Sequence, residues 1–180
     1  MNRLSLKFTF LIAAFFWLSG VPFAQSITVS LSGGSVSWNN SFGNALRPGN
    51  ATNAGSNTIT ITTSWNFLLL SNDLKLYAYF NSSTAALAHG ASLCTTGCPD
   101  IPSSAIELKT NSGAFAAVTG TGPFGSAGAS LILVDVPINL FNSFSSRSDV
   151  LTFNINLSSL PQLPADSYSG TLFIQAQATP

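Results

Sequence analysis

The chain has 180 residues, with six lysines and arginines, six acidic residues and one histidine, so its formal net charge at pH 7 is zero. Charged residues make up only 7% of the chain and form no basic patch, which argues against a nucleic-acid partner. The sequence also shows no calcium-loop spacing and no dense set of metal ligands, so we expect neither a metal nor another cofactor.

The first 26 residues have the pattern of a secretory signal peptide. Two basic residues precede the apolar run Phe8–Leu18, and small residues follow it. Cleavage is expected after Ala24 or after Ser26, and an uncleaved anchor is the alternative. The run is shorter than the roughly 20 apolar residues of a spanning helix. Residues 27–180 can bury one core, so we predict a single secreted, periplasmic or cell-surface domain without a membrane span.

Apolar and polar residues alternate in many segments, which is typical of strands that bury one face. In chain order these segments are residues 27–32, 36–38, 59–67, 74–80, 106–108, 115–118, 130–138, 151–157 and 168–179. Seven to nine strands without a strong amphipathic helix predict an all-β domain. One solvent-exposed face per sheet favours an antiparallel β-sandwich over a closed barrel.

Several local patterns predict how these strands are connected. Residues 71–73 predict the turn of a hairpin between the strands on either side. Residues 83–90 predict one or two turns of helix, because Ser83 or Thr84 could cap it and Gly90 could end it. Pro137 cannot donate a ladder hydrogen bond, so its strand should end there or lie at a sheet edge.

The last strand, Tyr168–Thr179, either pairs with the strand at residues 151–157 or presents an edge to another molecule. Exposed edges are normally protected by charge, proline or a bulge. This segment has no charged residue and no proline. We therefore predict that it is paired within the fold.

Cys94 and Cys98 are predicted to form a disulfide, because exported proteins fold in an oxidising compartment. The ring is small, so the bond should stabilise the fold by about 2 kcal/mol and hold one loop. A redox or metal role is the alternative. A redox pair more typically has the spacing C-x-x-C.

The acidic residues and the histidine show no catalytic pattern. His89 is not accompanied by a G-x-S-x-G motif, so we expect an ordinary surface or packing residue. Asp73, Asp100, Asp135 and Asp149 could converge in space, as in a glycosidase, but most of these aspartates are expected in turns. We therefore predict no enzymatic activity and no catalytic residue.

The aromatic residues offer a ligand-binding alternative. Trp65 and Tyr168 share the parity of apolar neighbours and should lie in the core. Tyr77 and Tyr79 lie opposite Leu76 and Ala78 on their strand and are expected to be exposed. Two exposed tyrosines could bind a sugar ring, so a small extracellular module for carbohydrate or another ligand is the alternative function.

Two segments resemble exported bacterial β-sandwich proteins of the pilin and spore-coat-U-like type. They are "LPADSYSGTLFIQAQA" near the C-terminus and "NTITITTSWNFLLLSNDLKLYAYF" in the middle of the chain. The resemblance implies an immunoglobulin-like topology, a structural or adhesive role at the cell surface, and self-assembly or assembly with other surface proteins. Ile27, Val29 and Leu31 could be donated to another subunit, or could form the first strand of a self-complete sandwich. The close pair of cysteines departs from the long-range disulfide common in pilins.

Overall fold

The computed structural model describes residues 26–33, 47, 49–67, 73–90, 95–164 and 167–179. Within these ranges the chain forms ten β-strands and a single turn of 3-10 helix, Ser103–Ala105. Seven strands have five residues or more, and the other three have two. No helix among these residues has the length and apolar character needed to span a membrane.

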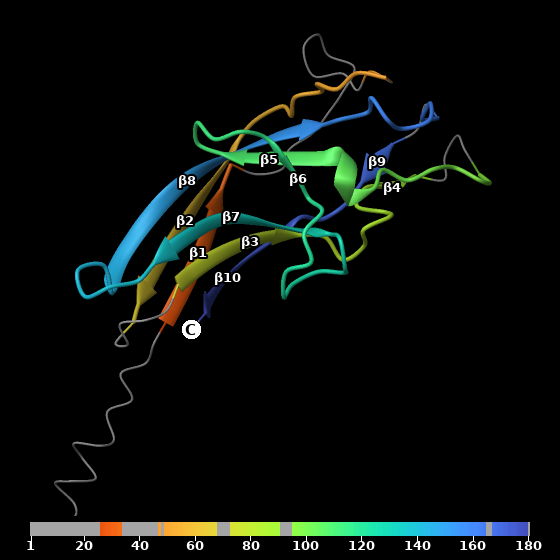
Figure 1. The fold of residues 1–180 in the computed structure, drawn as a ribbon. Coiled ribbons are helices and arrows are strands. Elements are labelled where there is room, and N and C mark those ends of the chain that lie inside the picture. Colours follow the sequence, from red (N-terminus) through yellow and green to blue (C-terminus); the bar gives the residue numbers. More distant parts are fainter. Residues whose placement is uncertain are drawn as a thin grey trace, which may run out of the picture.

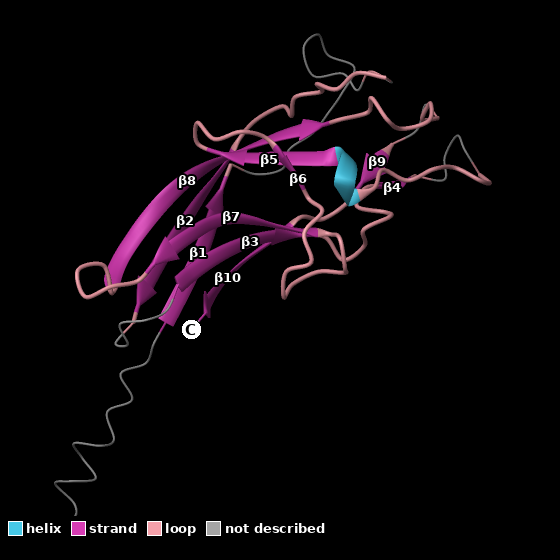
Figure 2. Cartoon of the chain, in the orientation of Figure 1, coloured by secondary structure: helices cyan, strands magenta, loops and turns pink. Residues whose placement is uncertain are grey.

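The strands form two main antiparallel sheets that pack face to face (Figures 1 and 2). The five-stranded sheet has the order β1 (Ser26–Ser32), β2 (Ile59–Asn66), β8 (Phe144–Ile155), β5 (Ile106–Thr110) and β6 (Ala116–Ala117). The three-stranded sheet has the order β10 (Phe173–Thr179), β3 (Asp73–Tyr79) and β7 (Ser130–Pro137). β4 (Ala88–His89) and β9 (Tyr168–Ser169) form a small third sheet.

The core lies between the two main sheets, and the predicted alternation places its residues. Ile59, Ile61 and Trp65 are buried on β2, while the residues between them, apart from Thr63, are more exposed. β3 contributes buried Leu76 from the opposite layer. Side chains at every second position of these strands therefore point into an apolar interior between the sheets. The predicted all-β sandwich is confirmed.

The predicted hairpin between β2 and β3 is wrong. β2 pairs with β1 on one side and β8 on the other, whereas β3 pairs with β10 and β7. The chain therefore crosses from one sheet to the other between Asn66 and Asp73. Both edges of β2 are already occupied, so β3 has no position beside it.

Two further local predictions fail because long-range hydrogen bonds compete with local structure. Residues 83–90 form no helix, since Leu87 exchanges backbone hydrogen bonds with Ile101, and β4 pairs with β9. The predicted strand at residues 36–38 lies outside the described residues. Pro137 behaves as predicted, because β7 ends there and is an edge strand.

The final strand is paired within the fold, as predicted, but with a different neighbour. β10 pairs with β3, from Phe173 opposite Tyr79 to Thr179 opposite Asp73. The strand at residues 151–157 instead belongs to β8 in the other sheet, where β2 and β5 flank it. The alternating face of β10 packs inward, with Ile174 and Ala176 against the core.

Candidate functional site

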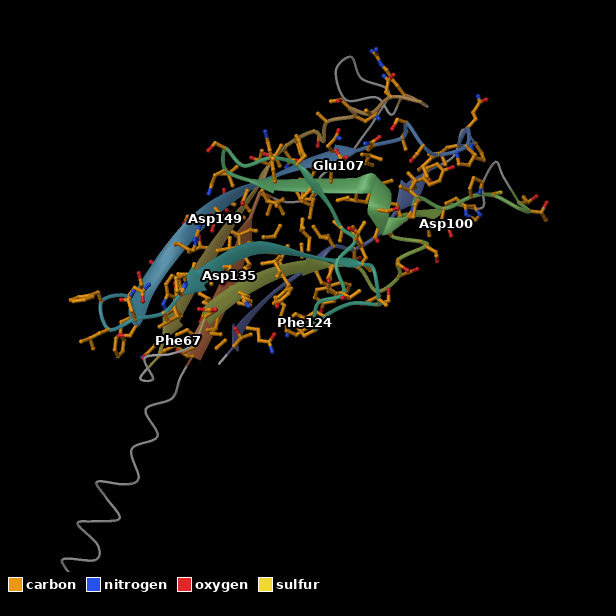
Figure 3. All side chains as sticks on the ribbon, viewed as in Figure 1. Phe67, Asp100, Glu107, Phe124, Asp135 and Asp149 are labelled. Atoms are coloured by element: carbon orange, nitrogen blue, oxygen red, sulfur yellow. The ribbon has the colours of Figure 1, made fainter. Side chains whose placement is uncertain are left out.

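The two tyrosines expected to be exposed lie on the outer face of β3, but a loop packs on both, so that Tyr77 is buried and Tyr79 is half-buried. Tyr77 is only 5% exposed, so the prediction of its exposure is wrong. Phe124, from the connection between β6 and β7, meets the Tyr77 ring edge to face, with 5.4 Å between ring centroids and an interplanar angle of 77°. Figure 3 labels Phe124 beside the three-stranded sheet. Tyr77 therefore offers no open ring face to a ligand.

The covering loop is held in place by Ser130 at the start of β7. The Ser130 hydroxyl accepts a hydrogen bond from the Gly122 amide at 2.8 Å and donates one to the Gly120 carbonyl at 2.8 Å. A Cβ on Gly122 would lie 2.8 Å from Cε1 of Tyr77. The absence of a side chain at Gly122 thus lets the loop backbone approach the buried ring.

Tyr79 takes part in a stack of aromatic rings. Its ring is stacked with Phe124 at 5.8 Å and with Phe173 of β10 at 5.2 Å between centroids. Its hydroxyl lies 3.3 Å from Oε1 of Gln175 on β10. Phe173 interrupts the alternation of the last strand in the sequence. The register explains it, because Phe173 lies directly opposite Tyr79.

The predicted disulfide lies partly outside the described residues. Cys98 is described, but Cys94 is not, so the Cys94–Cys98 bond stays a prediction.

His89 lies on β4 and contacts Asp100. The backbone N–H of His89 donates to Oδ1 of Asp100 at 3.0 Å, and His89 Nδ1 lies 2.8 Å from the same oxygen. These hydrogen bonds, the backbone one most strongly, hold the pKa of the Asp100 carboxyl below its usual value. The carboxylate therefore joins β4 to the loop that carries Asp100, as expected for an aspartate in a turn.

Four acidic side chains of the described residues lie apart from one another. Figure 3 shows Asp100, Glu107, Asp135 and Asp149 in separate parts of the molecule. Asp135 lies 3.7 Å from Lys75 on the neighbouring strand. Among the described residues there is also no group of three His, Cys, Asp or Glu side chains that could hold a metal ion.

Glu107 stabilises the segment that precedes β2. Its carboxylate accepts hydrogen bonds from the amides of Asn154 at 2.7 Å and Asn156 at 2.9 Å. Asn154 in turn accepts the backbone N–H of Asn53 at 2.7 Å. The described residues just before β2 are thus held along β8, and Glu107 has a structural role.

Asp149 was expected in a turn before a strand, and this expectation is wrong. It lies inside β8, with its side chain 1% exposed, on the same face as Leu151. Arg147 donates to both carboxylate oxygens, at 2.7 and 2.6 Å, and Asn111 donates at 2.7 Å. The segment with Arg147 and Asp149 can remain part of a strand because Arg147 and Asn111 donate hydrogen bonds to the inward-facing Asp149 carboxylate.

The sheet edges differ in how they are protected, and this contrast defines the candidate site. β7 carries Asp135 and ends at Pro137, and β6 has only two residues. The part of β8 that extends past β5 has the inward-facing Arg147 and Asp149. Charge, proline and short length are devices that prevent strands from adding to an edge.

The edges of β1 and β10 have none of these protective features. Neither Ser26–Ser32 nor Phe173–Thr179 contains a charged residue or a proline. In the described residues, β1 pairs only with β2 and β10 only with β3. The two strands lie on the same side of the sandwich and contact each other (Figure 1). We call this pair of strands the unprotected seam.

No protein-family model, no curated protein and no solved structure matches the chain. The resemblance to pilin and spore-coat-U-like proteins, and the immunoglobulin-like topology it implies, therefore stay predictions.

Proposed function

We propose that the protein is an exported, non-enzymatic structural or adhesive β-sandwich that assembles with copies of itself along the unprotected seam. The observation that carries the proposal is the contrast between the edges. β7 and β6 are protected by charge, proline or short length, while β1 and β10 are not. An uncharged edge presents backbone N–H and C=O groups that can pair with another strand.

The exposure of β1 supports this role. All seven of its side chains are exposed or half-buried, and Leu31 near its end is 54% exposed. β1 therefore contributes little to the core compared with the central strand β2, whose inward side chains are buried. A strand of this kind can rearrange or accept a neighbour at a small cost in hydrophobic burial.

We predict that a lysine placed on either seam strand suppresses self-assembly. Thr28→Lys on β1 and Gln175→Lys on β10 each add a charge at an exposed position of an edge strand. Size-exclusion chromatography with light scattering should show larger species of the natural protein as concentration rises. Each variant should need roughly tenfold more protein to reach the same size, which corresponds to about 1.4 kcal/mol.

Ser64→Lys is the matched control for the seam variants. Ser64 is equally exposed, but it lies on β2, where both edges are occupied by β1 and β8. The control should assemble like the natural protein. A natural protein that stays monomeric at every concentration would contradict the proposal, and so would equal suppression by all three lysines.

The carbohydrate-binding alternative gains no support from the tyrosines. Tyr77 is buried under the loop, and Tyr79 is stacked with two phenyl rings. The geometry favours a role for this cluster in attaching the loop to the three-stranded sheet.

A further inference from the structure

An apolar surface lies at one end of the sandwich, on the connection from β7 to β8. Leu140 is 68% exposed, Phe141 is 97% exposed and Phe144 is 61% exposed. We call these three residues the apolar tip. Figure 1 shows this connection at the end of the molecule where β1 begins and β10 ends. The tip does not belong to the seam, because β2 lies between β8 and β1 in the five-stranded sheet.

The loop that carries the tip is built by its own asparagines. The Asn142 side chain accepts the backbone N–H of Asn139 at 2.7 Å and donates to the Pro137 carbonyl at 2.9 Å. The Asn139 side chain accepts the backbone N–H of Phe141 at 2.9 Å. Trp65 of the core donates its indole N–H to the Asn142 carbonyl at 2.8 Å. A well-ordered loop thus presents a nearly fully exposed phenylalanine, at a cost to solubility.

We propose that the apolar tip inserts into the interface of a phospholipid bilayer. Entry into an apolar phase is costly for backbone groups without hydrogen bonds. The N–H groups of Asn139, Phe141 and Asn142 are all bonded within the loop. No residue from Pro137 to Ser146 is charged. Phe141, the most exposed residue of the tip, can therefore enter the lipid without a charge beside it and with its own amide hydrogen-bonded.

The size of the tip favours lipid over a second copy of the chain. Two phenyl groups and one leucine offer on the order of 400 Å² of apolar surface. A stable protein interface needs about 800 Å² from each partner. A bilayer needs no matching surface, so three side chains are enough for weak and reversible binding.

The path of the chain also brings this end to a membrane. Ser26 pairs with Asn66, and Asn66 pairs with Phe144, so the described chain starts beside the tip. Seven residues separate the end of the apolar run Phe8–Leu18 from Ser26 in the sequence. The predicted signal peptide would place that run in a membrane during export, and the described chain starts at the end that carries the tip.

The charges at this end favour neutral lipids. Lys75 pairs with Asp135, Arg147 pairs with Asp149, and Asp73 at the start of β3 adds a negative charge. Anionic headgroups attract lysine and arginine clusters, and the described residues at this end form no such cluster. Binding should therefore occur on phosphatidylcholine, should not increase with phosphatidylserine, and should change little between low and high salt.

The experiment measures partition of the full protein, with its natural N-terminus, onto phosphatidylcholine vesicles by co-sedimentation. Phe141→Ser should lower the partition coefficient about tenfold or more, because it removes the phenyl group that enters the lipid. Ile132→Ser is the control, since Ile132 is 48% exposed on β7, away from the tip. It should bind like the natural protein. All three proteins share the same N-terminus, so the difference reports on the tip.

A second variant provides a local signal. The tryptophan emission of Phe141→Trp should shift to shorter wavelength when vesicles are added. Equal partition of the natural protein and Phe141→Ser, together with no shift in Phe141→Trp, would overturn the proposal. A dimer lost on Phe141→Ser without vesicle binding would overturn it in favour of a second copy. Seam variants that lose self-assembly should keep their vesicle binding.

Discussion

Single residues in this protein show how a charged stretch can form part of a strand. Arg147 and Asp149 would be expected in a loop because both are charged, yet they lie in β8 with Asp149 buried. The bidentate guanidinium and the amide of Asn111 provide three hydrogen bonds to that carboxylate. Asn111 reaches it from the turn after β5, where its backbone has a φ of 51°. Asparagine tolerates this left-handed conformation better than most residues.

We predict that Arg147→Ala lowers the free energy of unfolding by about 3 kcal/mol, because it leaves a buried carboxylate without its cation. Lys75→Ala is the matched control. It breaks a partly exposed pair at 3.7 Å and should cost less than about 1 kcal/mol. Urea unfolding curves of the two variants check this, and equal midpoints would contradict it.

The contact between Asp100 and His89 makes stability depend on acid pH. Hydrogen bonds from the His89 backbone and ring lower the pKa of Asp100 in the folded state. A lowered carboxyl pKa stabilises the fold above the unfolded pKa of about 3.9, and that contribution is lost as pH falls through the folded value. We expect the melting temperature of Asp100→Asn to fall less than that of the natural protein as the pH is lowered from about 5 to about 2. Parallel curves for the two proteins would show that the contact contributes nothing.

At the scale of single elements, the sequence predicted which segments form strands, but it did not predict which strands pair with each other. The alternation of Ile59, Ile61 and Trp65 is visible in the sequence and matches their burial on β2. Nothing in residues 71–73 shows that β3 lies in the other sheet. That arrangement follows from the pairing of β2 with β8, more than 70 residues away along the chain. Hydrogen bonds between strands carry no local sequence pattern.

The loop over the three-stranded sheet is an element that only packing explains. Phe124 and Gly122 lie in a Gly- and Ser-rich stretch that looks like an open loop in the sequence. The edge-to-face contact of Phe124 with Tyr77 and the close approach of Gly122 show that it is attached to the sheet.

We predict that Gly122→Ala destabilises the protein by about 1 to 3 kcal/mol, because the added carbon forces the loop away from the Tyr77 ring. Thr121→Ala, at an exposed position in the same loop, is the control and should have little effect. Thermal unfolding measures the cost, and near-ultraviolet circular dichroism reports the tyrosine environment. Unchanged spectra and stability for both variants would show that the loop does not pack as described.

At the scale of the whole molecule, the two ends of the sandwich and its two sides differ. One side has edges protected by Asp135, Pro137 and the short β6, and the other has the seam of β1 and β10. One end carries the apolar tip, near the start of the described chain. The proposed assembly along one side and the proposed lipid contact at one end are therefore compatible within the same sandwich.

The sequence by itself determined that this protein is an all-β sandwich, since an apolar residue at every second position is a local property of the chain. It also predicted correctly that the strand with Pro137 ends there or lies at a sheet edge, because proline lacks the N–H that a ladder needs. Only the tertiary structure decided that Tyr77 is covered, that Asp149 is buried and that β1 and β10 form an unprotected seam. Each of these depends on contacts between residues far apart in the chain, which side-chain periodicity does not encode.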